Sequence, residues 1–445
     1  MKKVDLTKGN VAKVLLMLAL PIMGSSLLQF TYNLVDMLWI GHLGSKSLAS
    51  IGSASFFINL GSAIGALIVT GAGIKVAHGM GRKDIEDVKT YIYLGIVLTG
   101  LISAIYAGAL ILFGKSFITF LGLSEVDVKE MAYAYLAWSA PMLILSNFNN
   151  LFSRIFVSLG SSKSVLKINT VGLILNIVLD PIFIYVFKWG VVGAAIASIV
   201  AHLMMLMSYL IMGKAYISFK ARSHATYEKV SEIIHLGTPV AVQRILFTMI
   251  NIFLAKIIAP FGAEAVAAQK IGVQIEAITY MVTGGLNGAV ASFIGQNYGA
   301  QKQERMRKGY QIALMVGMVY SVVTLMIFLI FPGQLVGLFV EDWATTEIAI
   351  AYLKVIAYSQ IFNAMEMIST GYFIGIGKPK VPSMISMIFT SIRLPMAYVF
   401  TEHLGVDGIW WSITISTILK GSVLTTIYLL RSKDLEHHVD ENSYK

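Results

Sequence analysis

Two aspartates lie within apolar runs that are long enough to cross a membrane. Asp36 lies in the run 27–40, and Asp180 lies in the run 165–187. An unpaired carboxylate near the centre of a bilayer costs roughly 2.5–3.5 kcal/mol or more, so acids at this depth usually belong to an ion or substrate pathway. These two residues are therefore the first candidates for function.

Asp180 belongs to a polar element. Asn176 precedes it by four residues, so both side chains lie on one face of a helix. Pro181 follows at once and frees the carbonyl of Ile177 from the helical hydrogen-bond ladder. Carboxylate, amide and carbonyl oxygens suit a small cation, and a carboxylate alone can hold a proton. The alternative is that Asp180 only caps a kinked helix or pairs with a neighbouring helix.

The two aspartates are expected at a similar depth. Each lies a similar distance before a glycine at the outer end of its run, Gly44 for Asp36 and Gly190 for Asp180. Two carboxyl groups at one level can share a cation or a proton, and their titrations are then coupled.

The composition sets the elements that must position these acids. Of 445 residues, 56% are hydrophobic and 13% charged, and the mean hydropathy is +0.74. A chain of this kind has too few polar residues to cover a soluble globule, which predicts an all-α, polytopic membrane protein. Twelve membrane spans are predicted, near residues 14–41, 48–76, 90–114, 130–153, 164–187, 190–213, 232–259, 265–294, 309–331, 346–371, 381–401 and 406–430.

The basic residues predict the orientation. With a cytoplasmic N-terminus, the tails and the turns on that face hold 22 Lys and Arg residues. The opposite face holds four: Lys46, Lys115, Lys129 and Lys188. Both termini are therefore expected in the cytoplasm, in a cell membrane. The net charge of +10 reflects this bias together with a deficit of acids and gives no reason to expect a nucleic-acid partner.

An internal repeat divides the chain. The segment Leu18–Pro21 recurs as Leu236–Pro239, and three further pairs keep the same spacing of 218 residues: Gly44/Gly262, Ala49/Ala267 and Gly81/Gly299. Each copy holds six spans, so both enter the membrane the same way round. The prediction is two six-helix lobes related by a pseudo-two-fold axis along the membrane normal, with a cavity between them. Residues 1–213 form the N-lobe, 214–231 a cytoplasmic linker, 232–430 the C-lobe and 431–445 a cytoplasmic tail.

These features together resemble the multidrug and toxic compound extrusion (MATE) family. The resemblance covers the whole chain. It is carried by the two six-span halves, Pro21 and Asp36 in the first span, the Asn176–Pro181 element, and the turns at 79–82 and 295–300. The family implies export of small amphiphilic, often cationic compounds, driven by inward H⁺ or Na⁺. The resemblance places the cation site on Asp36, Asn176, Asp180 and Ser198, with Tyr135 nearby; for Ser198 the alternative is simple helix packing.

One departure favours the DinF-like branch of that family. The NorM-like branch uses a glutamate in span seven, whereas this span reads Pro239–Phe247 without an acid. Coupling is then expected from the N-lobe acids alone. The C-lobe residues that could act in substrate binding or gating are Glu276, Arg393, Arg244 and Glu366. A Glu276 ion pair with Arg393 or Arg244 is the structural alternative, and Glu366 is expected to serve in gating or packing.

Other function classes are disfavoured. There is no cysteine and no metal-like histidine spacing, and Gly114–Ser116 lacks the leading glycine of a phosphate-binding loop, since Ala109 stands there. We therefore expect a monomer that is not an enzyme, uses no cofactor or ATP, and contacts only membrane lipids and small substrates. Methionine runs such as 204–207 suit an adaptable cavity, but they suit lipid-facing helices equally well. The alternative function is a flippase for lipids or lipid-linked oligosaccharides.

Overall fold

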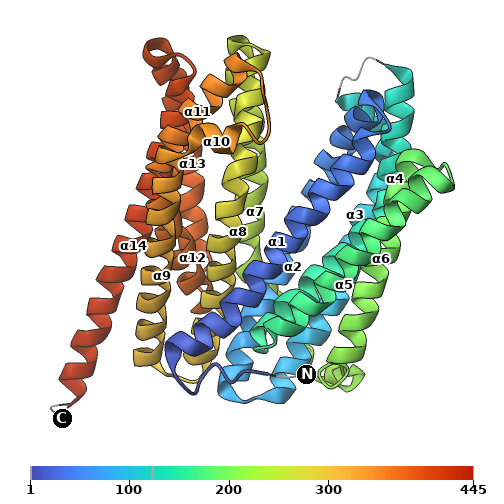
Figure 1. Cartoon of the computed structure of the whole chain (residues 1–445). Helices are drawn as coiled ribbons and strands as arrows, with labels where there is room; N and C mark the ends of the chain where they lie inside the picture. The colour runs from blue at the N-terminus through green and yellow to red at the C-terminus, as the bar shows by residue number, and fades with distance from the viewer. Residues whose placement is uncertain (1–2, 122–124, 444–445) are drawn as a thin grey trace. The chain divides into compact units, whose positions relative to one another are not determined.

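The computed structural model describes residues 3–121 and 125–443, and within these ranges the chain is almost entirely helical (Figure 1). In chain order the elements are α1 (Val11–Gly41), α2 (Ser45–Arg82), α3 (Ile85–Phe120), α4 (Val126–Ser158), α5 (Ser162–Pro181), η1 (Ile182–Val186), α6 (Gly190–Gly213), η2 (Phe219–His224), α7 (Tyr227–Ile258), η3 (Ala259–Phe261), α8 (Ala263–Gly299), α9 (Gln303–Ile330), α10 (Pro332–Val336), α11 (Trp343–Ala357), α12 (Gln360–Gly375), α13 (Lys380–Leu404) and α14 (Asp407–Ser443).

The predicted spans are confirmed. Ten helices of the described chain are long and apolar enough to cross a membrane, and α11 with α12 forms an eleventh, bent span. The 33-residue α4 lies where the remaining span was predicted. The protein is therefore a multi-pass, all-α membrane protein. The predicted tail at 431–445 continues α14 as far as Ser443, and its last two residues lie outside the described part of the chain, as does Lys2 at the start.

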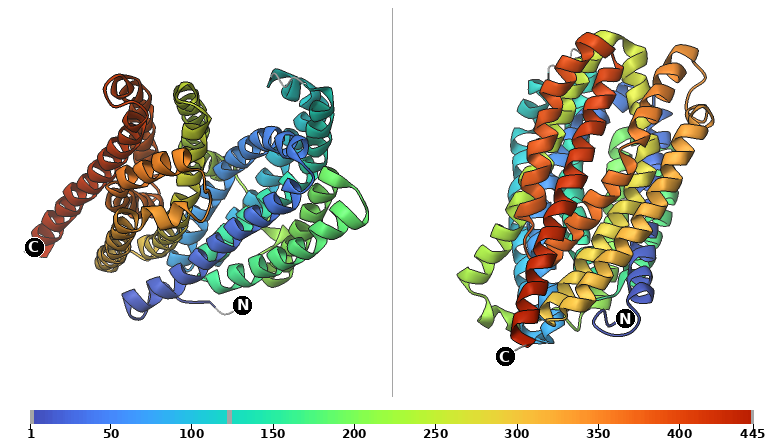
Figure 2. Two further views of the ribbon diagram at one scale, coloured as in Figure 1. Left: turned by 45° about the horizontal axis from the view of Figure 1, so that its top comes forward. Right: turned by 90° about the vertical axis from the view of Figure 1, so that its left-hand side faces the viewer.

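The chain forms two compact units. The first comprises residues 1–6 and 20–241, and the second comprises residues 7–19 and 242–445. In the first, α2 packs along α3 and α4, and α4 packs on α6; in the second, α12 packs on α8, α9 and α14 (Figure 2). The divisions fall inside two repeat-related helices, α1 and α7, close to Pro21 and Pro239.

The first part of α7 is built into the first unit by an unusually close approach to α2. A Cβ atom on Gly237 would lie 1.8 Å from the carbonyl oxygen of Leu67, and one on Gly71 would lie 2.1 Å from that of Ile233. Only glycine allows two helix backbones to approach so closely. Beside this contact, Glu232 of α7 forms an ion pair of 2.7 Å with Lys75 of α2.

Two helices change course at polar side chains. α5 ends after Pro181 in a π-helical turn, in which the Phe187 amide donates to the Ile182 carbonyl at 2.9 Å. The span at 346–371, predicted as one helix, bends by 54° between α11 and α12. At that bend the Ser359 hydroxyl and the Gln360 amide both donate to the Ile356 carbonyl, at 2.8 and 3.4 Å, in competition with the backbone ladder.

Candidate functional site

The two predicted acids meet inside the first unit. Asp36 of α1 and Asp180 of α5 are joined by a hydrogen bond between their carboxyl groups. Such a bond requires one proton between the two groups. Asn176, one helical turn before Asp180, donates from Nδ2 to Asp180 Oδ1 at 3.1 Å. The spacing of four residues therefore places the amide and the carboxyl group together as the sequence predicted.

Three oxygen atoms of this cluster receive no hydrogen bond from a nitrogen or hydroxyl donor. They are Asp36 Oδ1, Asn176 Oδ1 and Asp180 Oδ2, all of them buried. Asn176 and Asp180 are fully buried. A buried polar atom without a partner costs about 1–3 kcal/mol, so three at one place need an explanation beyond folding. A small cation or an added proton would satisfy them.

The other two predicted members of the site lie close by. The Ser198 hydroxyl of α6 is 2.6 Å from the Tyr32 hydroxyl of α1. Tyr135 of α4 lies in electrostatic range of both acids, and its hydroxyl makes a hydrogen bond with Ser139. Tyr32 also lies in electrostatic range of Asp36 and Asp180. It was missed in the sequence, although its position four residues before Asp36 places it on the same helix face.

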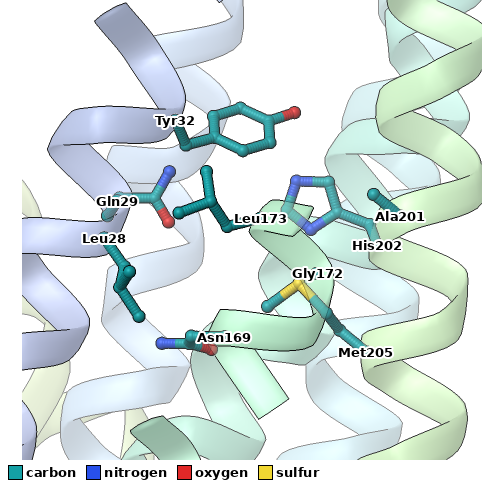
Figure 3. Close-up of a pocket in the computed structure, with 9 residues that line it drawn as sticks. All are labelled: Leu28, Gln29, Tyr32, Asn169, Gly172, Leu173, Ala201, His202 and Met205. Carbon is teal, nitrogen blue, oxygen red and sulfur yellow. The ribbon is translucent and has the colours of Figure 1, made fainter. Parts of the chain in front are cut away.

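A pocket adjoins this cluster through Tyr32 (Figure 3). Its lining comes from α1, α5 and α6 of the first unit and includes Gln29, Tyr32, Asn169, Leu173, His202 and Met205. Met205 therefore faces the pocket, whereas its neighbours Met204 and Met207 are 44% and 49% exposed. Both readings of the methionine run thus hold, each for different residues.

Glu276 of the second unit is satisfied by neutral groups. It accepts hydrogen bonds from the Tyr352 hydroxyl at 3.0 Å and from the Gln360 amide at 3.5 Å. The ion pair suggested for it is not formed with either arginine of the described chain: Arg393 donates to Ser416 at 3.0 Å, and Arg244 is exposed on α7. The bend before α12 makes this arrangement possible, because it places Gln360 beside α8.

Glu366 has a basic partner that the sequence did not suggest. Lys420 of α14 lies 3.0 Å from Glu366 of α12, and both side chains are less than 10% exposed. Ser386 of α13 donates to the other carboxyl oxygen at 3.4 Å. Lys420 stands in the apolar run 406–430, and the depth criterion that identified the acids would also have found it.

The family model described as MatE matches this chain twice, over residues 21–182 and 239–399. The two matches begin 218 residues apart, the spacing of the repeat.

Relatives match over nearly the full length. The chain is 26% identical to the "Probable multidrug resistance protein NorM" of Thermotoga maritima, covering 95% of this chain and 93% of that protein. It is also 26% identical to the "Multidrug export protein MepA" of Staphylococcus saprophyticus, covering 96% of this chain and 95% of that protein.

Two solved structures share the fold. A MATE protein in complex with MaL6 superimposes with a TM-score of 0.92 at 23% identity, covering 98% of this chain and 100% of that one. A transporter of the MOP superfamily from Pyrococcus furiosus superimposes with a TM-score of 0.91 at 23% identity, covering 98% and 99%. With both halves matched by one family model, the chain belongs to the MatE family of membrane transporters and is not an enzyme.

Proposed function

We propose that this chain is an antiporter that exports amphiphilic, often cationic organic compounds in exchange for an inward cation, H⁺ or Na⁺. The coupling site is the cluster of Asp36, Asn176 and Asp180. The observation that carries the proposal is the set of three buried oxygens without donors beside two hydrogen-bonded carboxyl groups. The names of the two relatives, a multidrug resistance protein and a multidrug export protein, support the substrate class.

The proposed cycle follows from the charge of the cluster. When the pair takes up a cation, its net charge changes, and the packing of α1, α5 and α6 around it changes with it. Tyr32 transmits the change, because it contacts Ser198 of α6 and lines the pocket. Cation binding thereby weakens substrate binding in the pocket, and substrate leaves. The transporter then returns to its inward-open form and releases the cation to the cytoplasm.

The second unit does not supply coupling in this proposal, which corresponds to the DinF-like arrangement. Glu276 already accepts two hydrogen bonds, and Glu366 is already paired with Lys420. Neither glutamate therefore offers the unsatisfied oxygens of the first unit. The protein acts as a monomer in the cell membrane, with both termini in the cytoplasm. The cation gradient supplies the energy, so no ATP is needed.

The membrane potential alone can drive useful accumulation. A potential of about 100 mV contributes ~2.3 kcal/mol for each charge that moves inward. If one net charge moves per cycle, the export ratio approaches roughly fifty-fold.

Reconstituted vesicles test the proposal. Na⁺ and pH gradients are imposed separately, and movement of a fluorescent organic cation is followed for wild type, Asp36→Asn and Asp180→Asn. Wild type should respond to one of the two gradients, and each variant should lose that response. Asp127→Asn is the matched control, since this exposed acid lies outside the cluster. Unchanged coupled transport in both variants would remove the proposal, and gradient-independent lipid scrambling would favour the flippase.

A further inference from the structure

The pocket of Figure 3 contains a histidine whose tautomer is fixed by its neighbours. The Asn149 Nδ2 group donates to the His202 backbone carbonyl at 2.9 Å and lies 3.0 Å from His202 Nδ1. A carbonyl only accepts, so the amide nitrogen must face this side, and Nδ1 must then accept as well. A neutral imidazole that accepts at Nδ1 carries its proton on Nε2. The ring points into the pocket toward Tyr32, so Nε2–H is a donor available to a ligand (Figure 3).

A second donor is fixed in the same way. The Tyr209 hydroxyl donates to Asn169 Oδ1 at 3.3 Å, and a hydrogen bond with Ser153 fixes the Tyr209 hydroxyl in turn. The amide oxygen of Asn169 is therefore occupied, and its NH₂ group is the part left for a ligand. Figure 3 shows that group turned across the pocket toward Leu28.

The rest of the pocket is uncharged. None of its nine described lining residues is Asp, Glu, Lys or Arg. The Tyr32 and His202 rings form one wall, with centroids 6.3 Å apart at 54°, and Leu173 and Met205 supply apolar surface. Such a pocket rejects a ligand that would leave its donors unpaired and favours one that offers acceptors.

We propose that this pocket selects substrates by an uncharged, planar ring portion that carries a hydrogen-bond acceptor such as a ring carbonyl, with His202 and Asn169 as the donors. The cationic part of the substrate remains outside the pocket. The inference rests on the proposed function, because it takes the pocket as the place where exported compounds bind. Asn149 and Tyr209 act as positioning residues, since they hold the two donors without lining the pocket.

A matched pair of probes tests the proposal on the unmodified protein. One probe is an acridone with a trimethylammonium tail on its ring nitrogen, and the other is the dihydroacridine in which CH₂ replaces the carbonyl. Affinities are measured by equilibrium dialysis with purified protein in nanodiscs. We expect the carbonyl probe to bind about tenfold more tightly, as two neutral hydrogen bonds would provide. Equal affinities would overturn the inference.

Variants then locate the donor. His202→Phe keeps a ring but removes Nε2–H, so the affinity ratio between the probes should fall to a few-fold or less. His235→Phe, which removes an exposed imidazole on α7, should leave the ratio unchanged. Nitrogen chemical shifts of ¹⁵N-labelled histidine should identify the Nε2–H tautomer in wild type and its loss of preference in Asn149→Leu. An unchanged ratio in His202→Phe, or an Nδ1–H tautomer in wild type, would contradict the assignment.

The failure of this inference can be distinguished from failure of the proposed function. Asp36→Asn should lose cation-coupled transport and still show the tenfold ratio between the probes. Equal probe affinities with Asp36-dependent transport intact would remove only the acceptor selectivity. Coupled transport that survives in Asp36→Asn would remove the coupling site and leave the selectivity of the pocket standing.

Discussion

The Tyr32 hydroxyl is the residue-level link between the acids and the pocket. It is paired with Ser198 at 2.6 Å, and the ring of Tyr32 forms a wall of the pocket. If this hydroxyl pair supports the cation site, Tyr32→Phe and Ser198→Ala should each weaken cation affinity by roughly two- to tenfold, the range expected for one neutral hydrogen bond. Cation affinity can be measured by titration calorimetry on the purified protein.

The double variant decides whether the two hydroxyls act together. Tyr32→Phe/Ser198→Ala should lose no more affinity than either single variant, because removing one partner already breaks the bond. Additive losses would show instead that the two residues act independently.

The candidate site was predictable to the extent that its residues stand out by depth and spacing. Asp36 and Asp180 were identifiable as costly charges in apolar runs, and Asn176 by its helical spacing from Asp180. The roles of Asn149 and Tyr209 were not predictable, because each acts on a residue more than 35 positions away through a single hydrogen bond. No local pattern in a sequence encodes a contact of that kind.

At the scale of elements, the Glu366–Lys420 pair joins α12 to α14. Lys420→Ala leaves the Glu366 carboxylate buried without its partner and should destabilise the protein by about 3–5 kcal/mol. The double variant Glu366→Gln/Lys420→Met removes both charges and should recover most of that loss. Thermal unfolding in one detergent measures both effects, and a stable Lys420→Ala variant would show that the pair contributes little.

The start of α11 should respond to acid. The Asp342 carboxylate accepts hydrogen bonds from the Thr345 backbone amide at 2.9 Å and its hydroxyl at 2.7 Å, and these bonds hold the pKa of Asp342 below its usual value. Because the folded pKa is lowered, the stabilisation is complete above the unfolded pKa of about 3.9 and is lost as pH falls through the folded value. Amide exchange in the first turn of α11, corrected for its intrinsic pH dependence, should accelerate in that window. Asp342→Asn should flatten this pH response.

The helices themselves were predictable because their apolar runs have the length of a membrane crossing. The bend between α11 and α12 was not, since it lacks a proline and arises from Ser359 and Gln360 competing for one carbonyl. The π-helical turn after Pro181 was only partly foreseen: proline predicts a disturbed ladder but not which pairing replaces it.

At the scale of the whole molecule, the duplication is the best-predicted feature. The family model matches each half at the spacing found by eye in the sequence. The distribution of chain between the compact units was not foreseen, since α1 and α7 each begin in one unit and end in the other. Backbone contacts such as that of Gly237 with Leu67 produce this division, and hydropathy carries no record of them.

Orientation is a whole-molecule prediction, and the absence of cysteine makes it simple to test. Lys46→Cys lies between α1 and α2, and Lys163→Cys lies at the start of α5. A membrane-impermeant maleimide should label the first variant on intact cells and the second only after permeabilisation, because positive charge is retained in the cytoplasm. The reverse pattern would invert the topology.

The central claim is that the Asp36/Asp180 pair binds the coupling cation, and direct binding tests it most closely. Purified protein is assayed for Na⁺ by equilibrium dialysis with a radioactive tracer and for H⁺ by proton release when substrate is added in weak buffer. Wild type should bind Na⁺ or release a proton, and Asp36→Asn/Asp180→Asn should do neither while still binding substrate. Cation binding or proton release of equal size in the double variant would contradict the claim.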